Sequence, residues 1–508
     1  MFENQPKGLW ALALANTGER FGYYTMLAVF LLFLQANFGF PTGTASVIYA
    51  TFLMFVYFLP VIGGIAADRW GFGRMVTTGI LIMFVGYLLL AIPLGGDSIA
   101  VAVMGAALLL VSLGTGLFKG NLQVMVGRLY DEPCFANRRD AGFSLFYMAI
   151  NIGAMFAPTA AIAIMNWAQE DLGISEADSY HFAFGVACAS LIVSIAIYYA
   201  FKGWFSHVLE GEDKKADKAQ VVDTLTPAET KERIICLCLV FTVVIFFWMA
   251  FHQNGATLTL FARDYTQTSS TGVQSMMFDV TNLVAAIFIV YGLFGLFQSK
   301  TGNGKGIAII ILAAAACYLG WQYSNLSGDV TVYPPIFQQF NPCFVVMLTP
   351  VSVGIFNWLA KKNMEPTSPT KIGLGMLVAA CGFFIMIGAS IGLLLPDAQT
   401  AAIEAGGDVT RVSANWLVST YLVLTFAELL LSPIGISFVT KVAPPKYAGL
   451  IMGLWFASTA IGNFLVQIPG LLWGANVNLV YIWAVLAGIC LLSALFIFSI
   501  IKRLNKVA

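Results

Sequence analysis

Long apolar runs, separated by short polar segments, recur along the whole chain. A helix needs about 20 predominantly apolar residues to cross a membrane. Windows of this length predict fourteen membrane-spanning helices, at residues 8–36, 44–67, 73–94, 99–122, 141–166, 181–202, 233–261, 277–298, 306–323, 338–360, 371–395, 414–440, 446–472 and 479–501. The pattern therefore predicts an all-α polytopic membrane protein.

The composition agrees with this fold class. Of the 508 residues, 59% are hydrophobic and 10% are charged, whereas soluble domains contain about 25% charged residues. These values exclude an ordinary soluble protein and a disordered chain. The formal net charge is zero, so no basic surplus indicates a nucleic-acid partner. The eight cysteines are scattered through the chain, which favours roles as small core residues over metal or disulfide roles.

The lysine and arginine residues predict how the chain is oriented. If the N-terminus is cytoplasmic, only Arg263 and Arg411 fall in outside loops, while Arg20 and Lys119 fall within helices. All other basic residues then fall on the inside, as the positive-inside rule requires. We therefore expect a protein of the cell membrane with both termini in the cytoplasm.

A long polar stretch divides the predicted helices into two groups. Residues 203–232 follow the sixth helix and contain the charged run GEDKKADKAQ. This pattern is typical of two membrane-embedded bundles joined by a cytoplasmic linker. We predict an N-terminal six-helix bundle at residues 1–202 and a C-terminal bundle at residues 233–508, with an inserted helix pair at about 277–323.

Ionisable side chains inside the predicted helices are the first candidates for function, because each costs about 2.5–3.5 kcal/mol at the centre of a membrane helix. Glu19 and Arg20 lie in the middle of the first helix, Lys119 in the fourth and Glu428 in the twelfth. His252 lies within the seventh, beside two amide side chains. Each has a structural alternative: an ion pair for Glu19 and Arg20, snorkelling for Lys119, and a satisfied core position for His252.

The signs of these charges predict a class of ligand. Arg20 shares one helix face with Asn16, Glu19, Tyr23 and Tyr24, because these residues recur at three- and four-residue spacing. Cations in the first bundle and a carboxylate in the second suit a zwitterionic ligand that lies between the bundles. Its carboxylate would meet the cations of the first bundle, and its ammonium group would meet the carboxylate of the second.

At these positions the sequence resembles the proton-coupled oligopeptide transporter family of the major facilitator superfamily. The family's first-helix pattern E-x-x-E-R-F-x-Y-Y corresponds to NTGERFGYY here, and four further segments match in order: GGIAADRWGFGR, FYMAINIG, QQFNP and ELLLSPIG. The resemblance spans nearly the whole chain. It implies a major facilitator fold of two six-helix bundles plus an extra helix pair, and import of di- and tripeptides together with protons.

The resemblance also implies roles for individual residues. Arg20 and Lys119 would hold the peptide carboxylate, and Asn341 and Glu428 would hold its amino end. Trp455, in MGLWFAS, is similar to the family's aromatic pocket residue. Side chains near the carboxylate end would be Tyr23, Tyr24, Tyr57 and Asn151.

The sequence departs from the family pattern at two positions that bear on proton coupling. The first glutamate of the first-helix pattern is Asn16, which does not titrate, and an acidic position of the seventh helix is His252. Glu19, beside Arg20, is expected to stay ionised as a gating pair. We therefore expect His252, whose unperturbed pKa is about 6.5, to carry the coupled proton, with Glu428 as second choice. The extra helix pair follows the seventh helix instead of the sixth.

The leading hypothesis is thus a secondary active transporter that imports di- and tripeptides by proton symport through alternating access. One alternative is a small-anion transporter, for example of nitrate, although Glu428 would repel an anion without an amine. The other is a peptide facilitator without proton coupling. The sequence contains no H-E-x-x-H metalloprotease pattern, and we do not expect the protein to be an enzyme. We expect peptides, protons and membrane lipids as partners, a monomer, and no cofactor beyond the proton gradient.

Overall fold

The structure is a computed structural model that describes residues 5–135, 138–209, 225–299, 301–326, 328–407, 409–444 and 447–507. In these ranges fourteen helical segments are long and apolar enough to cross a membrane. They coincide with the fourteen predicted runs, so the predicted all-α membrane fold is confirmed. Five of the lysines that fall on the predicted inside lie outside the described residues: Lys214, Lys215, Lys218, Lys300 and Lys446.

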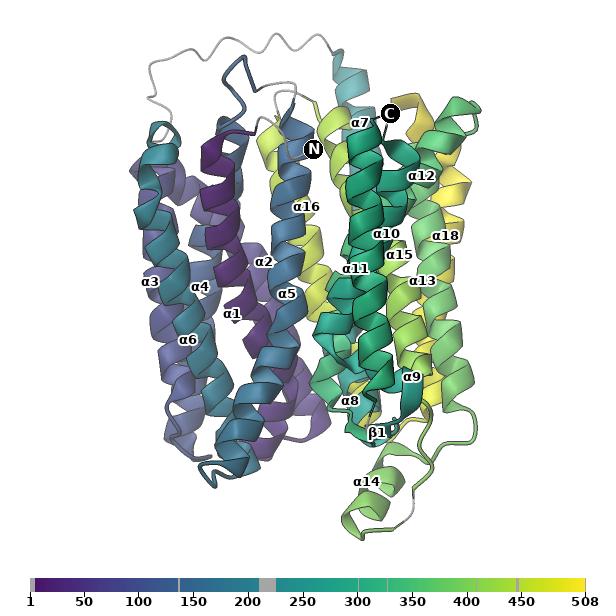
Figure 1. Ribbon diagram of the computed structural model, residues 1–508. Helices are drawn as coiled ribbons and strands as arrows, with labels where there is room; N and C mark the ends of the chain where they lie inside the picture. The colour runs from purple at the N-terminus through teal and green to yellow at the C-terminus, as the bar shows by residue number, and fades with distance from the viewer. Residues whose placement is uncertain are drawn as a thin grey trace.

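The first six membrane helices form the N-terminal bundle, on the left in Figure 1. The main contacts are those of α3 with α4, of α1 with α5 and α6, and of α2 with α4. The helices are α1 (Lys7–Phe38), α2 (Thr42–Trp70), α3 (Phe72–Ala91), α4 (Ser98–Arg128), α5 (Arg139–Glu170) and α6 (Glu176–Ala200). Two short 3-10 turns follow, η2 (Lys202–Trp204) and η3 (Ser206–Val208).

The remaining helices form the C-terminal bundle, in which α13 packs against α15 and α18. Its long elements are α7 (Pro227–Phe251), α12 (Phe340–Lys361), α13 (Ser368–Ser390), α15 (Asn415–Val442), α16 (Ala448–Leu465) and α18 (Leu479–Val507). Its shorter elements are η4 (His252–Gly255), α8 (Thr257–Asp264), β1 (Ser269–Ser270), α9 (Gly272–Ser275), η5 (Met276–Phe278), β2 (Val330–Thr331), η6 (Pro334–Gln339), α14 (Pro396–Glu404) and α17 (Gln467–Gly474).

The inserted pair consists of α10 (Val280–Gln298) and α11 (Gly302–Ser324). These two helices pack against each other, and α10 also packs against α12. Only Ala308 and Ala315 of α11 are buried. The pair therefore lies at the side of the C-terminal bundle.

Two predicted continuous helices are broken in the structure. Residues 233–261 form α7, the turn η4 and α8, and residues 446–472 contain α16 and α17. At the first break the carbonyl oxygen of Asn254 accepts hydrogen bonds from Tyr421 Oη at 2.6 Å and from Thr259 Oγ1 at 3.2 Å. Side-chain donors thus replace the lost helical bonds, as an apolar environment requires.

The two breaks are also connected to each other. Gln253, in η4, donates through Nε2 to the carbonyl oxygen of Val466 at 3.2 Å, between α16 and α17. The same amide donates to the carbonyl oxygen of Met249 at 3.0 Å. Gln253 is fully buried, so it is a structural residue that holds both breaks together.

Both chain ends lie at the same end of the molecule, at the top of Figure 1, which we call the terminal end. The helix α14 and strand β1 lie at the opposite end. The two bundles meet where α2 packs against α16 and α17, and where α5 packs against α12 and η6. Functional side chains of the two halves therefore face each other across this interface.

The contact between α2 and α4 predicts a test of the packing. A Cβ atom at Gly63 would collide with the carbonyl oxygen of Gly116, whereas a Cβ atom at Gly64 would meet nothing within 4 Å. We expect Gly63→Ala to lower the free energy of unfolding by about 1–3 kcal/mol, the usual cost of overpacking. Thermal unfolding of the purified protein in detergent measures this change.

The adjacent substitution Gly64→Ala is the matched control, because it has the same helix propensity and no clash. Alanine is favoured over glycine in a helix by up to about 1 kcal/mol, so its midpoint should stay or rise. Equal midpoints for both variants would contradict the close approach of α2 and α4.

Candidate functional site

A cavity of about 280 Å³ lies between the two bundles. Such a volume is close to the lower limit of about 300–1,000 Å³ for small-molecule sites. Its wall combines aromatic and apolar side chains with four ionisable ones, from both bundles. The lining includes Arg20, Tyr23, Tyr24, Tyr57, Lys119, Tyr147, Asn151, Trp248, Phe251, His252, Asn254, Gln338, Asn341, Glu428, Trp455 and Phe456.

Arg20 reaches the cavity from α1 while its charge is neutralised by its neighbour. Its Nε and Nη2 atoms each lie 2.5 Å from an oxygen of Glu19, so the pair is bidentate. The guanidinium also lies 4.7 Å from the centre of the Tyr23 ring. Both charged residues are buried, and Glu19 is not part of the cavity wall. The predicted ion pair is therefore present, and it leaves Arg20 with little excess charge.

Lys119 lies on α4 and faces the same cavity. Its Nζ atom lies 4.1 Å from the centre of the Tyr57 ring, a cation–π contact. No carboxylate among the described residues lies within ion-pair distance of this ammonium group. Because α4 continues to Arg128, six residues beyond the predicted end, Lys119 lies within an unbroken helix. It is the cation of the cavity wall that an anionic group of a ligand would meet.

Glu428 faces the cavity from α15 of the other bundle and is 7% exposed. Its carboxylate accepts hydrogen bonds from Asn341 Nδ2 at 3.0 Å and from Tyr147 Oη at 3.3 Å. Asn341 also donates to Thr425 Oγ1 at 3.0 Å. Tyr147 belongs to α5, so the bond from its hydroxyl joins the two bundles across the cavity.

His252 occupies the first position of η4, where α7 ends, so its predicted place within an unbroken helix is wrong. Its Nδ1 atom lies 2.5 Å from Oδ1 of Asn463. Because an amide oxygen only accepts, Nδ1 carries the proton. The ring stacks on Trp248 at 5.0 Å and lies 5.8 Å from the ring of Tyr57. The imidazole is thus fixed in the cavity wall by one hydrogen bond and by ring contacts.

The structure brings most of the predicted site residues to this one cavity. Asn16 does not line it: this residue is 3% exposed, and its Nδ2 atom has no hydrogen-bond partner in the described part of the chain. Asn151 lines the cavity and donates to the carbonyl oxygen of Tyr147 at 3.0 Å. Trp455 lines it as well, with its ring edge-on to Phe241.

Sequence reasoning missed several residues of the wall. Tyr147 lies inside the FYMAINIG segment, and Gln338 lies inside QQFNP, so a signal for both was present. Trp248 and Phe251 were hidden in an apolar run. Nε1 of Trp248 and Oη of Tyr23 are buried without a hydrogen-bond partner in the described residues. These orphan donors favour a ligand that brings acceptor oxygens.

Contacts between the bundles close the cavity at the end opposite the terminal end. Gln338 donates to the carbonyl oxygen of Ala28 at 3.1 Å, and Thr159 donates to Gln339 at 3.1 Å. Further out, Arg263 donates to Gln35 at 2.7 Å. All three bonds join an N-terminal helix to the C-terminal bundle.

One catalytic pattern occurs in the chain, and its setting is structural. Residues 388–392 read GASIG, a match to the G-x-S-x-G pattern of hydrolases, which requires a turn from strand to helix. Here Ser390 is the last residue of the helix α13. Its hydroxyl accepts a hydrogen bond from Nε1 of Trp483 at 2.9 Å.

The fold and the cavity define a polytopic membrane protein with a charged site between two bundles. A sequence model described as the POT family matches residues 74–231 and 318–471. The chain belongs to the POT family, which is a family of transporters. The fold is that of the major facilitator superfamily, as the sequence predicted.

Relatives and solved structures resemble the chain over nearly its full length. It is 29% identical to the peptide transporter YePEPT of Yersinia enterocolitica subsp. palearctica, over 92% of this chain and 88% of that protein. It is 27% identical to the di-/tripeptide transporter of Lactococcus lactis subsp. cremoris, over 90% and 87%. A crystal structure of peptide transporter POT in complex with sulfate matches with a TM-score of 0.72 and 25% identity, over 100% and 96%.

The hydrogen bonds around Glu428 predict a test of the site. Asn341→Ala removes one donor from a buried carboxylate, which costs about 1–3 kcal/mol. In a Glu428→Gln background the same change removes only a bond between neutral groups. We expect Asn341→Ala to lower the midpoint of thermal unfolding clearly more when Glu428 is present.

The two backgrounds form a double-mutant cycle, whose coupling energy between contacting residues is about 0.5–3 kcal/mol. Thr425→Val serves as a control that leaves the donor to Glu428 in place. A coupling energy of zero between Asn341 and Glu428 would refute their hydrogen bond.

Proposed function

We propose that the protein is a secondary active transporter that imports di- and tripeptides across the cell membrane. The observation that carries this proposal is a single cavity with a free cation, Lys119, on the N-terminal bundle and a held carboxylate, Glu428, on the C-terminal bundle. The names of the relatives, a peptide transporter and a di-/tripeptide transporter, support the same substrate class.

The charge balance of the cavity supports a zwitterionic substrate. Arg20 is already neutralised by Glu19, so Lys119 and Glu428 are the two charges that a ligand would complement. A peptide with a free carboxylate and a free ammonium group supplies one partner for each. An amino acid supplies the same charges closer together, so we expect charged groups on opposite bundles to favour a peptide. Aromatic wall residues such as Trp455 would contact the side chains.

The terminal end is proposed to face the cytoplasm. Lysine and arginine side chains at the ends of the described helices and in the turns beside them gather there, for example Arg69, Lys202 and Lys441, as the positive-inside rule expects. Hydrogen bonds such as that of Gln338 to Ala28 close the opposite, outer end. The structure would then be a state closed to the outside. Import by alternating access requires these bonds to break and contacts at the inner end to form.

A small-anion transporter is the less favoured function. Nitrate could bind at Lys119, but the carboxylate of Glu428 faces the same cavity of about 280 Å³ and would repel it. The unpaired donors Trp248 Nε1 and Tyr23 Oη would suit the oxygens of either an anion or a peptide. The carboxylate end and the amino end of the substrate must therefore be tested separately.

Blocking either end of the substrate tests the proposal. Purified protein in liposomes should take up labelled dialanine under an inward proton gradient. Dialanine amide and N-acetyl-dialanine should compete at least about a hundredfold less well, because each leaves a buried charge unpaired, a loss of about 3–5 kcal/mol. Competition against labelled dialanine measures both values.

Free alanine and nitrate are the controls in the same assay. The proposal predicts weak competition by both. Strong competition by nitrate would instead indicate the anion transporter. Equal competition by the blocked and free peptides would show that Lys119 and Glu428 do not bind the two charged ends of the peptide.

Proton coupling is proposed to run through His252. Asn16 removes one carboxylate that the family pattern would supply, and Glu19 accepts hydrogen bonds from two of the three nitrogens of Arg20. His252 lies at the break between α7 and α8 and bonds to Asn463 near the second break. A proton drives transport only if it favours one conformation. A charge added at this break would change the contacts that distinguish the conformations.

The variant His252→Gln tests this coupling. We expect accumulation of dialanine under a proton gradient to fall about tenfold or more, whereas counterflow, which needs no net proton movement, should continue. The matched control is His181→Gln, because His181 binds the carbonyl oxygen of Leu90 away from this cavity.

Three outcomes separate the mechanisms. Intact accumulation in His252→Gln would exclude His252 and leave Glu428, which Glu428→Gln then tests. Accumulation that never exceeds equilibrium in the unmodified protein would indicate a facilitator without proton coupling. Loss of counterflow as well as accumulation would assign His252 to substrate binding.

A further inference from the structure

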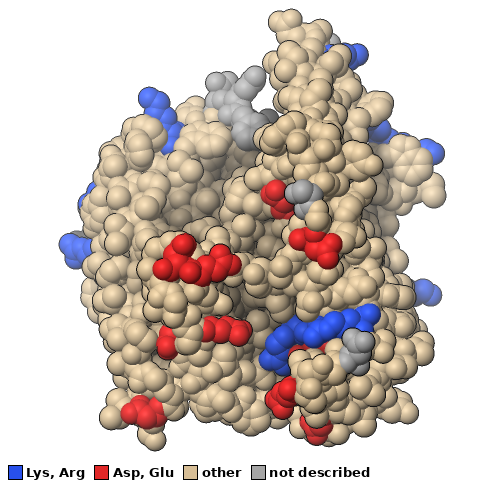
Figure 2. All heavy atoms as spheres, turned by 60° about the horizontal axis from the view of Figure 1, so that its bottom comes forward, with Lys and Arg blue, Asp and Glu red and all other residues tan. Residues whose placement is uncertain are grey.

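A second cavity, of about 590 Å³, lies at the outer end between the bundles. Residues of α1, α5 and α6 line one side, and α8, β2 and η6 line the other. Figure 2 looks toward this end of the molecule and shows several separate acidic patches on the face, with a stretch of basic side chain among them. The polar residues of the wall include Gln35, Asn166, Gln169, Glu176, Arg263 and Thr268. We call this cavity the outer vestibule.

Arg263 is the only lysine or arginine of the vestibule wall within the described residues. Its Nε and Nη2 atoms donate to the carboxylate of Asp264 at 2.7 and 2.9 Å, and Nη1 donates to Oε1 of Gln35 at 2.7 Å. A guanidinium has five N–H groups, so two of them have no partner in the described part of the chain. Asp264 balances the charge of Arg263 as Glu19 balances that of Arg20, but the side chain of Arg263 is 34% exposed whereas that of Arg20 is 3% exposed, so the two remaining N–H groups of Arg263 are accessible to a ligand.

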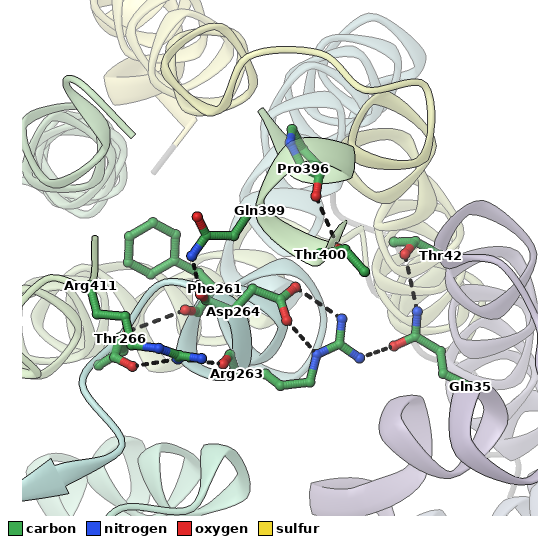
Figure 3. A network of polar contacts seen from close by, with 10 residues as sticks. All are labelled: Gln35, Thr42, Phe261, Arg263, Asp264, Thr266, Pro396, Gln399, Thr400 and Arg411. Carbon is green, nitrogen blue, oxygen red and sulfur yellow. Dashed lines mark hydrogen bonds and ion pairs between the residues drawn. The ribbon is translucent and has the colours of Figure 1, made fainter. Parts of the chain in front are cut away.

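The end of α8 that carries Arg263 is held firmly, as Figure 3 shows. Arg411 donates through Nη1 to the carbonyl oxygens of Arg263 at 2.8 Å and Thr266 at 2.9 Å. Gln399 donates to the carbonyl oxygen of Asp264 at 2.6 Å. Binding sites with fixed polar groups lose less entropy when a ligand binds. The backbone that carries Arg263 is therefore fixed by residues of the α13–α15 connection, and the guanidinium itself is oriented by Asp264.

We propose that the outer vestibule is a carboxylate-binding site, anchored by Arg263, that captures the peptide before it reaches the central cavity. The proposal rests on the proposed import of peptides. A carboxylate forms charge-assisted, often bidentate bonds with arginine, about twice as strong as bonds between neutral groups. It would therefore displace the neutral amide of Gln35. Exposed Glu176, on the opposite side of the vestibule, suits the ammonium end.

The position of Gln35 gives the site a second consequence. Gln35 belongs to α1 of the N-terminal bundle, and Arg263 belongs to the C-terminal bundle, so their bond helps to hold the outer end closed. A second bond, from Nε2 of Gln35 to Thr42 at 3.0 Å, fixes the amide in place. A carboxylate that takes the place of the amide oxygen would release this contact when the substrate arrives from outside.

A cysteine reporter tests the site without transport. Thr268 is exposed on the vestibule wall, so we replace it in the full-length chain by Thr268→Cys, together with Lys119→Ala to disable the central cavity. Right-side-out membrane vesicles are labelled with a membrane-impermeant maleimide. We expect dialanine and N-acetyl-dialanine to slow labelling at least about threefold, and dialanine amide to slow it much less, because only the amide lacks a carboxylate.

Two further substitutions separate a ligand site from a simple closing contact. Arg263→Gln should raise the half-protecting concentration of dialanine about tenfold or more, the equivalent of losing about 1.4 kcal/mol. Gln35→Leu should lower it, because the competing amide is gone. Arg263→Lys should lie between Arg263→Gln and the parent, and labelling without peptide shows that each variant is folded and exposed.

Several results would overturn the proposal: no protection by dialanine, equal protection by the amide, or the same direction of change in Arg263→Gln and Gln35→Leu. The last result would mean that Arg263 only closes the outer end. Failure of the proposed function is seen separately, because liposome uptake depends on the central cavity and reporter protection does not.

Discussion

The arrangement of this protein depends on the need to give every buried charge a partner or a cavity inside an apolar interior. Glu19 is fully buried because Arg20 supplies two donors to it. Glu428 is held by two neutral donors, and Lys119 lies on an aromatic ring. The central cavity lies where these differently compensated charges from the two halves meet.

The same constraint governs the backbone. The chain leaves the helical path at η4, where Tyr421 and Thr259 take over the carbonyl oxygen of Asn254. Gln253 then bonds to the carbonyl oxygen of Val466, where α16 gives way to α17. Because Gln253 joins the two breaks, a change at one alters a bond made at the other. The two breaks therefore form one mechanical unit beside the cavity.

The sequence predicted what is local and missed what is joined over a long distance. Hydropathy alone located fourteen spanning segments, because a membrane demands about 20 apolar residues for each. It did not locate the break at His252, although the polar run HQNG lies there, because the bonds that stabilise the break are made with residues far along the chain, Tyr421 and Val466. The bond between Tyr147 and Glu428 joins residues 281 positions apart, and that between Gln35 and Arg263 joins residues 228 apart. No local pattern encodes such pairs.

Arg20 is neutralised by Glu19 within one helix, whereas Lys119 and Glu428 have no partner of opposite charge among the described residues. This difference explains how a ligand would influence the conformation. A ligand shifts a conformational equilibrium only by the difference in its affinity for the two states. A molecule bound by Lys119 alone would contact one bundle, and its affinity would hardly depend on where the other bundle lies. A molecule with both a carboxylate and an ammonium group would, in the proposed binding mode, pair with Lys119 and Glu428 together, so its affinity would depend on the distance between the bundles. Opposite charges on opposite bundles would thus make the affinity of a zwitterionic ligand depend on closure, whereas the Glu19–Arg20 pair lies within α1 and does not bridge the bundles.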